Sequence, residues 1–307
     1  MTGALRRRFG PLALLLLAVV AAACSSGGTS SGGPGSRTLV ISGIPDQNVA
    51  TLNRIFGLTA SYLSKATGLD VRYAPAADYS AIVTAFRRGD VQLAWFGGLT
   101  GVQAREMAPG AEAIVQRPRD AQFHSVFIAQ SGIPIRDLSG LKGLTFTFGS
   151  ESSTSGHLMP RYFMSQAGVD PDKNLKGAPS YSGSHDKTYK LVESGAFQTG
   201  ALNEAVWESA VKEGKVDTSK VRVFYTTPSY YDYHWAVVGD IDKRIGPGTR
   251  EKVTKALLDL RADSSPEAKE LLSLFATDRF VPTEDKNYDS IRQVAEQLGI
   301  LRQYVGR

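Results

Sequence analysis

Cysteine and histidine are scarce in this chain of 307 residues. Cys24 is the only cysteine, and there are four histidines. A single cysteine forms no disulfide within the chain, and these residues do not recur at the spacing of a metal site. We therefore expect no thiolate chemistry, no metal and no other cofactor.

Long hydrophobic runs are also missing, except for one near the N-terminus. Three arginines, Arg6 to Arg8, precede an apolar run from Leu12 to Ala23. This run is short for a membrane span but typical of an export signal. Removing residues 1–23 lowers the formal net charge from +5 to +2. So small a positive excess does not indicate nucleic acid binding.

Cys24 follows three alanines, and this context resembles a bacterial lipobox, in which the cysteine is lipidated. Ala21 stands where a large aliphatic residue is usual, and a plain signal peptide with an accidental cysteine is the alternative. Residues 25–36 are nearly all Gly and Ser, which predicts a flexible tether. We predict a signal peptide at 1–23, a lipidated cysteine with its tether at 24–37, and an extracytoplasmic body anchored to the outer face of the bacterial cytoplasmic membrane.

Strand-like and helix-like segments alternate from residue 38 onward. The first are strand Thr38–Ser42, helix Val49–Lys65, strand Leu69–Tyr73, helix Tyr79–Arg88 and strand Val91–Phe96. This order predicts parallel pairing with right-handed crossovers. Ligands bind such sheets at the carboxyl ends of the strands, which are the loop 44–48, the surroundings of Tyr79 and the turn 96–98.

The second half repeats this alternation. A predicted crossing at Ser131–Pro134 leads into a second lobe, and Tyr230–Val238 leads back. Amphipathic helices at 248–261, 268–275 and 288–301 are placed on the first lobe. We predict an α/β fold of two Rossmann-like lobes joined by two hinge crossings, with lobe 1 at 38–130 plus 239–307 and lobe 2 at 131–238. This is the architecture of a hinge-closing binder.

The segment Ser150–Pro160 places hydroxyl groups at the start of a helix. Ser153, Thr154 and Ser155 follow the strand-like run 144–148 and precede the apolar-periodic segment 158–167. A helix start offers unpaired N–H groups and a partial positive charge, which favour an anion. The alternative is that one of the three is an ordinary N-cap with polar neighbours.

Four motifs together resemble the solute-binding lipoproteins of ABC importers for phosphate, phosphite and phosphonate, which have the type II periplasmic-binding fold. They are DYSAIVTAFRRGDVQLAWFGGLTG, SSTSGHLMP, SGSHD and YDYHW, at 78–101, 152–160, 182–186 and 231–235. The resemblance implies that a ligand oxyanion is held by Ser153, Thr154, Ser155, His185 and Tyr79. Asp232 is similar to an aspartate near the second crossing of that family.

Two positions depart from the family pattern. Phe96, before Gly97, stands where phosphonate-binding relatives have a tyrosine, so one oxygen ligand is lost. Around Asn203 and Glu204 the amine-recognising glutamate of aminoalkylphosphonate binders does not align, which argues against an aminated ligand. The motifs are most similar to a subgroup labelled selenate-type, which indicates a tetrahedral oxyanion.

Several of these residues have alternative interpretations. His185 is expected to donate to the anion, cationic or neutral, but it also fits a surface loop beside a helix cap. Asp232 accepts from a protonated ligand oxygen, orients His185, or lies at the hinge outside the site. Tyr79 also fits core packing, as do the aromatic residues of the motifs, Trp95, Tyr230, Tyr231, Tyr233 and Trp235.

We predict a monomeric receptor, not an enzyme, that captures a small tetrahedral oxyanion between two lobes. It passes this ligand to an ABC permease with its ATPase. The alternatives are a binder of a different small solute and a Ser-dependent hydrolase built on Ser153, His185 and Asp186. The hydrolase lacks the GxSxG elbow, and adjacent His and Asp residues are poorly placed to orient each other.

Overall fold

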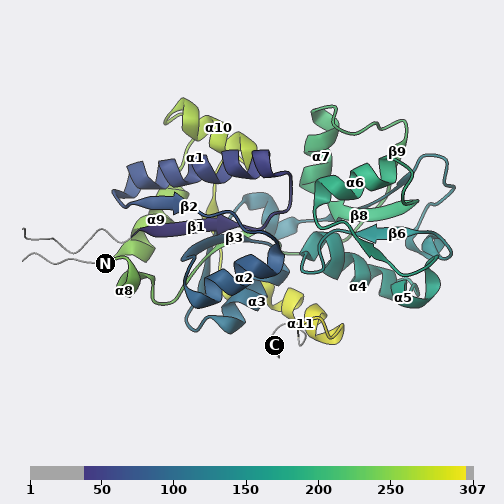
Figure 1. Ribbon diagram of the computed structural model, residues 1–307, viewed down its shortest axis with the longest axis horizontal. Helices are drawn as coiled ribbons and strands as arrows, with labels where there is room; N and C mark the ends of the chain where they lie inside the picture. The colour runs from purple at the N-terminus through teal and green to yellow at the C-terminus, as the bar shows by residue number, and fades with distance from the viewer. Residues whose placement is uncertain (1–37, 302–307) are drawn as a thin grey trace, which may run out of the picture. The chain divides into compact units, whose positions relative to one another are not determined.

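The computed structural model describes residues 38–301, whose strands form two mixed sheets within one compact unit (Figure 1). The predicted signal peptide, Cys24 and the Gly/Ser tether lie outside the described residues. No described helix is long and apolar enough to cross a membrane.

The first sheet has the strand order β11-β4-β10-β3-β1-β2. Its strands β1, β2 and β3 pair in parallel, as predicted, whereas β10 is antiparallel to both β3 and β4. Their bounds are Leu39–Gly43 (β1), Val71–Tyr73 (β2), Leu93–Phe96 (β3), Glu112–Gln116 (β4), His234–Val237 (β10) and Val281–Pro282 (β11).

The second sheet has the order β7-β6-β8-β5-β9. Strand β6 is parallel to β7 and β8, and β5 is antiparallel to β8 and β9. The bounds are Ser125–Gln130 (β5), Phe146–Phe148 (β6), Ser180–Tyr181 (β7), Thr199–Asn203 (β8) and Val221–Thr226 (β9). We refer below to the parts of the chain around the first and second sheets as lobe 1 and lobe 2.

The chain crosses between the sheets at 117–124 and again at 227–233. The predicted crossing at Ser131–Pro134 is wrong, because β5 already pairs with β8 and β9. The return crossing ends before β10, which lies inside the first sheet. The crossings pair with each other through an antiparallel bridge between Phe123 and Tyr230. The sequence pattern identifies a strand but not the sheet to which it belongs. The apolar sequence of β5 is compatible with either sheet.

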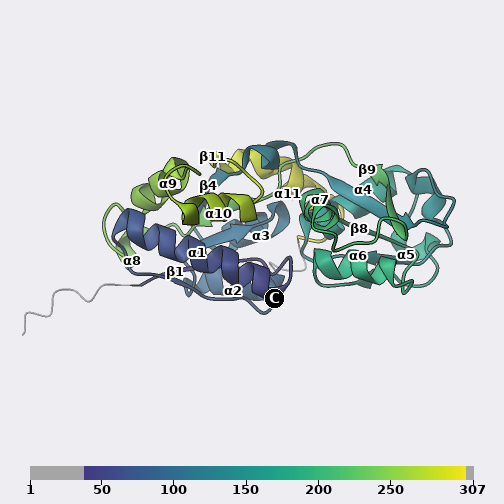
Figure 2. The ribbon, with the colours of Figure 1, turned by 90° about the horizontal axis from the view of Figure 1, so that it is seen from above.

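Helices cover both faces of each sheet. In Figure 1, α1 and α10 lie on one face of the first sheet and α2 and α3 on the other, while α6 and α7 lie opposite α4 and α5 on the second. Figure 2 shows α1, α9 and α10 together on the near side. The bounds are Val49–Thr67 (α1), Tyr79–Arg88 (α2), Gly98–Met107 (α3), Met159–Gln166 (α4), Pro171–Asn174 (α5), His185–Glu193 (α6), Glu204–Lys212 (α7), Ile241–Arg244 (α8), Thr249–Asp259 (α9), Pro266–Leu274 (α10) and Asp289–Gln297 (α11).

The predicted helices at 49–65 and 79–88 are present as α1 and α2, and their ends are capped. The Asp78 side chain accepts from Ala81 N before α2, and Gly68 and Gly89 end α1 and α2 with φ of 71° and 75°. Helix α3 was not predicted. Its first eight residues are all buried, so its sequence has no polar face to produce a helical periodicity.

The two lobes have different cores. Lobe 1 has one large cluster, to which α9, α10 and α11 contribute Val253, Leu271 and Ile291. Lobe 2 has two smaller clusters that include Phe146 in one and Val192 in the other. The C-terminal helices α9, α10 and α11 therefore complete the core of lobe 1.

Candidate functional site

The hydroxyl-rich segment forms a wide turn at the start of a helix. Thr154–Leu158 is a single π-helical turn (η3) that leads directly into α4, and Leu158 N donates to Ser153 O at 3.0 Å. Ser153 is the N-cap, since its Oγ accepts from Gly156 N at 2.9 Å. A hydroxyl that accepts still has its own hydrogen to donate. Ser153 is therefore an ordinary N-cap, as the alternative interpretation states. The cap does not use the hydrogen of its hydroxyl group.

Gly156 allows His185 to approach this turn. A Cβ at position 156 would lie 3.1 Å from His185 Cε1 and 3.0 Å from Ser153 Oγ. Such spacing is tighter than ordinary Cβ contacts, so any larger residue would push the imidazole away. Glycine therefore brings a hydroxyl cap and a histidine from another helix together.

Thr154 connects the two lobes. Its Oγ1 accepts from the N–H of Leu99 in α3 at 2.9 Å, and the residue is 2% exposed. Ser155 is equally buried, and its side chain lies close enough to Asp232 and Tyr230 to lower the pKa of both. The hydroxyls of η3 therefore face the other lobe and the hinge, not solvent.

Asp232 is buried with half of its carboxylate unused. Oδ1 accepts from Gly98 N at 2.8 Å, while Oδ2 has no hydrogen-bond partner among the described residues. Burial raises the pKa of this carboxyl to about 7, although the hydrogen bond from Gly98 N lowers it. An unpaired buried acceptor costs free energy, which a donor from a ligand would recover.

Tyr79 offers the complementary feature, an unused donor. It is the first residue of α2, it is 2% exposed, and its hydroxyl has no hydrogen-bond partner among the described residues. Burial and the nearby charge of Asp46 raise its pKa well above the ordinary value, while the Ser153 side chain lowers it. Tyr79 therefore stays protonated and can donate.

His185 is a neutral donor. Its Nδ1 accepts from Asn203 N at 3.3 Å, which assigns the ring proton to Nε2. Burial lowers its pKa to about 3, so the imidazole carries no charge at neutral pH. Its backbone N–H donates to Asp46 O at 2.9 Å, a second bond between the lobes.

The structure places three further buried polar residues beside these, to which the sequence analysis assigned no specific contact. The Tyr233 hydroxyl donates to Asp46 Oδ2 at 2.8 Å and accepts from Asn203 Nδ2 at 2.9 Å. Burial raises the pKa of Asp46 to about 6, despite the Tyr233 hydrogen bond. The third is Arg117, a buried cation. The sequence did mark the loop 44–48 and the crossing that contains Tyr233, but nothing in it connects the two.

Arg117 is bound on every side at the hinge. Its guanidinium pairs with Asp120, with Nη2 2.6 Å from Oδ1, and Nη1 donates to Phe275 O at 2.9 Å. The cation lies 5.1 Å from the Tyr233 ring centroid and 5.4 Å from that of Trp95. The backbone carbonyl of Asp120 accepts from Asp232 N at 3.0 Å. The Arg117 cation therefore lies against the rings of Tyr233 and Trp95. The donors described above, the Tyr79 hydroxyl and His185 Nε2–H, are neutral.

Phe96 and Gly97 lie differently from the expectation. The Phe96 ring packs edge-on against Phe86 of α2, with centroids 5.2 Å apart, so it belongs to the core of lobe 1. Gly97 N donates to Thr100 Oγ1 at 3.1 Å, and the next two N–H groups donate to Asp232 and Thr154. The turn 96–98 was predicted as a place where a ligand binds, but the amides at 97–99 are bound by protein acceptors.

The hydrolase alternative gains no support from this geometry. Asp186 accepts from the Ser184 hydroxyl at 2.6 Å, and the Nδ1 of His185 is taken by a backbone amide. The residues therefore lack the Asp–His contact that orients a catalytic imidazole. Among residues 38–301 there is also no group of three or more His, Cys, Asp or Glu arranged to hold a metal ion.

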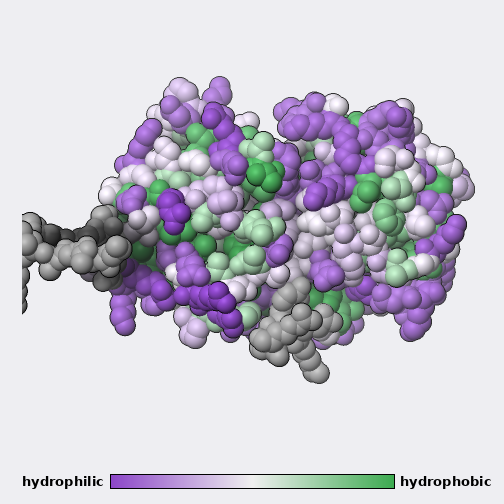
Figure 3. Space-filling model, viewed as in Figure 1, coloured by the Kyte–Doolittle hydropathy of each residue, from purple (hydrophilic) through white to green (hydrophobic). Residues whose placement is uncertain are grey.

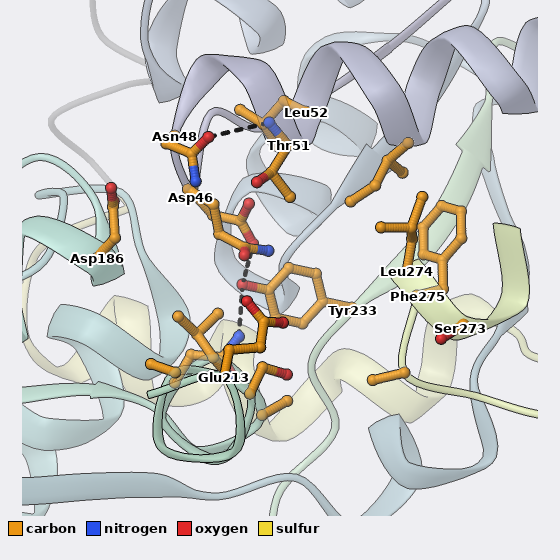
Figure 4. A pocket seen from close by; sticks show the side chains of 18 of the residues that line it. Asp46, Asn48, Thr51, Leu52, Asp186, Glu213, Tyr233, Ser273, Leu274 and Phe275 are labelled. Atoms are coloured by element: carbon orange, nitrogen blue, oxygen red, sulfur yellow. Dashed lines mark hydrogen bonds between the residues drawn. The ribbon is translucent and has the colours of Figure 1, made fainter. Parts of the chain in front are cut away.

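A pocket of about 250 Å³ lies next to these buried residues (Figure 4). Asp46, Asn203 and Tyr233 form part of its lining, together with residues of α1, α7 and α10. Figure 4 shows the hydrogen bond between Asp46 and the Tyr233 hydroxyl near the middle of the view, and the same hydroxyl accepts from Asn203 Nδ2.

Comparison with known proteins gives the same family from sequence and from structure. Residues 41–288 match the family model described as "ABC transporter, phosphonate, periplasmic substrate-binding protein". The chain is 42% identical over 273 residues to the probable ABC transporter phosphite binding protein PhnD1 of Prochlorococcus marinus, covering 87% of this chain and 91% of that protein. It is 25% identical over 280 residues to the phosphate-import protein PhnD of Mycolicibacterium smegmatis, covering 85% and 86%.

The crystal structure of PhnD1 from Prochlorococcus marinus in complex with methylphosphonate superposes with a TM-score of 0.83, covering 86% of this chain and 99% of that chain. The two sheets joined by two crossings are the type II periplasmic-binding fold. The chain belongs to the family of periplasmic substrate-binding proteins of phosphonate ABC transporters.

Proposed function

We propose that this protein binds a small phosphorus oxyanion of the phosphite, methylphosphonate or phosphate class between its two lobes. The observation that carries the proposal is the pair of unused polar atoms, the Tyr79 hydroxyl and Asp232 Oδ2. They come from different elements and lie beside the Ser153–Ser155 hydroxyls. A ligand that both accepts and donates hydrogen bonds would satisfy both atoms at once.

The complex holds one proton between Asp232 and the ligand. The oxygens of a tetrahedral anion accept from Tyr79, Ser153, Ser155 and the Nε2–H of His185. Asp232 Oδ2 needs a hydrogen, which comes from a monoprotonated ligand or from its own carboxyl group. Oxyanions of phosphorus carry such a hydrogen near neutral pH, whereas sulfate and selenate do not.

Relatives support this ligand class. The name of the 42% identical relative specifies phosphite, its crystal structure contains methylphosphonate, and the name of the 25% identical relative specifies phosphate. We propose that the bound ligand passes to an ABC permease with its ATPase, that the protein acts as a monomer, and that lipidated Cys24 anchors it at the membrane. Metabolic labelling with a fatty acid tests the anchor, and Cys24→Ser should abolish the label.

Calorimetric titration of the mature chain with phosphite, methylphosphonate, phosphate, sulfate and selenate tests the ligand class. We expect binding of at least one phosphorus oxyanion and, above pH 7, weaker or no binding of sulfate and selenate. Titration in buffers of different ionisation enthalpy should show proton uptake when the ligand is supplied as a dianion. Absence of heat with all five anions would refute the proposal.

We also propose that binding is not followed by chemistry. Incubation with activated esters and phosphoesters should give no turnover. Turnover that Ser153→Ala abolishes would favour the hydrolase instead.

A further inference from the structure

His157 is a buried histidine of η3 that the proposed anion site does not use. It is 5% exposed and lies two positions after Ser155 in the same turn. Residues two positions apart on a helical turn point in nearly opposite directions. Ser155 lies beside Asp232 at the hinge. The His157 ring instead packs against Phe148 and Tyr181, at centroid distances of 4.9 Å and 5.0 Å, inside lobe 2.

Both ring nitrogens of His157 are bound by protein groups. Nδ1 lies 2.6 Å from the backbone carbonyl oxygen of Glu151, which assigns the ring proton to Nδ1 as the donor. Nε2 accepts from Arg161 Nε at 3.1 Å and lies 3.3 Å from the Tyr181 hydroxyl. Burial lowers the pKa of His157 to about 4. The imidazole is therefore neutral at neutral pH and adds no charge to the anion site.

The bond from His157 to Glu151 closes the loop 149–152 onto η3. The two residues are six positions apart, and the hydroxyl residues 153–155 lie between them. The backbone supports the same closure, because Gly149 N donates to Gly156 O at 2.8 Å. The three hydroxyls therefore belong to a closed segment whose ends are joined by one side chain.

A π-helical turn depends on such support, because it is wider than the α-helix that follows it. Leu158 N donates to Ser153 O at 3.0 Å, five residues back. In an α-helical register the same amide would donate to Thr154 O, and the hydroxyls would rotate relative to α4. The bond between His157 and the loop opposes this change, because it holds the two ends of the segment together.

Arg161 fixes the orientation of the imidazole. Its Nη1 pairs with Asp172 of α5 at 2.6 Å, and its cation lies 5.4 Å from the Phe148 ring centroid. The surface over α5 is hydrophilic in Figure 3, and the Asp172 side chain is 60% exposed. A continuous series of contacts thus runs from the surface of lobe 2 through Arg161 and His157 to the Glu151 carbonyl.

We propose that His157 is a positioning residue of the anion site, whose bond to Glu151 O holds the hydroxyls at 153–155 in the orientation that receives the ligand. The inference rests on the proposed function, because it takes the ligand oxygens to be bound by this turn. Without the bond, the hydroxyls are still present but are no longer ordered in advance. A ligand that has to order them binds more weakly.

The test uses two amide side chains that replace different ring nitrogens. In His157→Asn the amide nitrogen takes the place of Nδ1 and donates to Glu151 O, whereas in His157→Gln the amide lies one carbon further out, near the place of Nε2. The ligand is whichever of phosphite, methylphosphonate and phosphate the wild type binds most tightly in calorimetry. We expect His157→Gln to weaken binding at least tenfold, and His157→Asn to stay within threefold of the wild type.

Val221→Ala is the control for stability. Val221 is fully buried in the core of lobe 2, in strand β9, which lies three strands from β6 in the sheet. Its truncation should lower the melting temperature but leave affinity unchanged. An equal loss of affinity in Val221→Ala and His157→Gln would show a general effect of destabilisation and overturn the inference.

Arg161→Met is the second variant, because it retains His157 but removes the donor to Nε2. We expect binding to weaken about threefold, and this variant decides the question if His157→Gln does not fold. Equal affinities in His157→Asn and His157→Gln would overturn the inference, as would wild-type affinity in both His157→Gln and Arg161→Met. If the wild type binds none of the three anions, the proposed function fails. If it binds and these substitutions have no effect, the positioning role alone fails.

Discussion

The starts of α3 and η3 are built alike and used differently. Each follows the end of a strand, β3 or β6, and each begins at the boundary between the lobes. At α3, the amides of Gly97, Gly98 and Leu99 are bound by Thr100, Asp232 and Thr154. At η3, Ser153 forms the cap and the neighbouring hydroxyls face the hinge.

This difference supports the proposal that the start of η3, and not that of α3, receives the anion. At α3 the chain supplies its own carboxylate, Asp232, so this start is closed to a ligand. The same carboxylate presents Oδ2 toward η3 without a partner. One aspartate therefore completes the first helix start and leaves the second to be completed from outside.

Asp232→Ala should have the largest effect. It removes the acceptor for the ligand proton and leaves the buried Gly98 N–H unpaired, a cost of about 3 kcal/mol. We expect affinity for phosphite or methylphosphonate to fall about a hundredfold in calorimetry. Asp232→Asn is the control, because its amide oxygen still accepts from Gly98 and its loss of affinity should be smaller. An affinity within threefold of wild type for Asp232→Ala would place the ligand elsewhere.

Thr154→Val should weaken binding about tenfold, because it removes the hydrogen bond from Leu99 N that joins the lobes. The control is Thr147→Val, a substitution of the same size and polarity in β6, where the hydroxyl donates to Phe148 O. Thr147→Val should change thermal stability but not affinity. Equal affinity losses in both variants would remove the special role of the α3–η3 contact.

Tyr79→Phe separates binding from stability. The Tyr79 hydroxyl has no partner among residues 38–301, so its removal should lower affinity about fivefold and leave the melting temperature unchanged or raised. The matched control is Tyr230→Phe, whose hydroxyl is 2.6 Å from Ser125 Oγ, and which should melt at a lower temperature. A lower melting temperature for Tyr79→Phe would show that its hydroxyl is satisfied within the protein.

The pH dependence of stability should be the smallest effect. The carboxyls of Asp46 and Asp232 have pKa values raised by burial to about 6 and about 7, from an ordinary value of 3.8. The folded state thus holds these protons more tightly than the unfolded state. Their stabilising contribution is complete below about pH 4 and is lost as the pH rises through 6 to 7.

A ligand-free melting series from pH 5 to pH 8 tests this, with an expected decrease of a few degrees. Asp232→Asn should make the series flatter. A melting temperature that rises between pH 6 and pH 8 would contradict the raised carboxyl pKa values.

Local features of the fold and of the candidate site could be predicted from the sequence. Contacts between residues that are distant along the chain could not. Asp78, Gly68 and the hydroxyls at 153–155 act over a few neighbours, so their caps and turn could be predicted. Helix α3 could not, because a helix buried on all sides has no amphipathic pattern. The Asp46–Tyr233 bond joins residues 187 positions apart, and no local signal distinguishes it.

The predicted position of the first crossing was wrong for a related reason. Periodicity identified the apolar strand β5, but its partners β8 and β9 lie more than 60 residues away along the chain. Ser131 and Pro134 are typical of a turn, and they do follow a strand, although not at the boundary of a lobe.

The paired crossings have a mechanical consequence. Phe123 and Tyr230 bond to each other, and Asp232 N bonds to Asp120, so the two crossings form a short ribbon that bends as one piece. Opening of the lobes about this ribbon would displace Asp232 and Tyr233 least, because both lie in the second crossing. It would separate Tyr79 and His185 further, because they lie in different lobes. A departing anion would therefore lose its contacts with Tyr79 and His185 before its contact with Asp232, so the second crossing sets the last step of release.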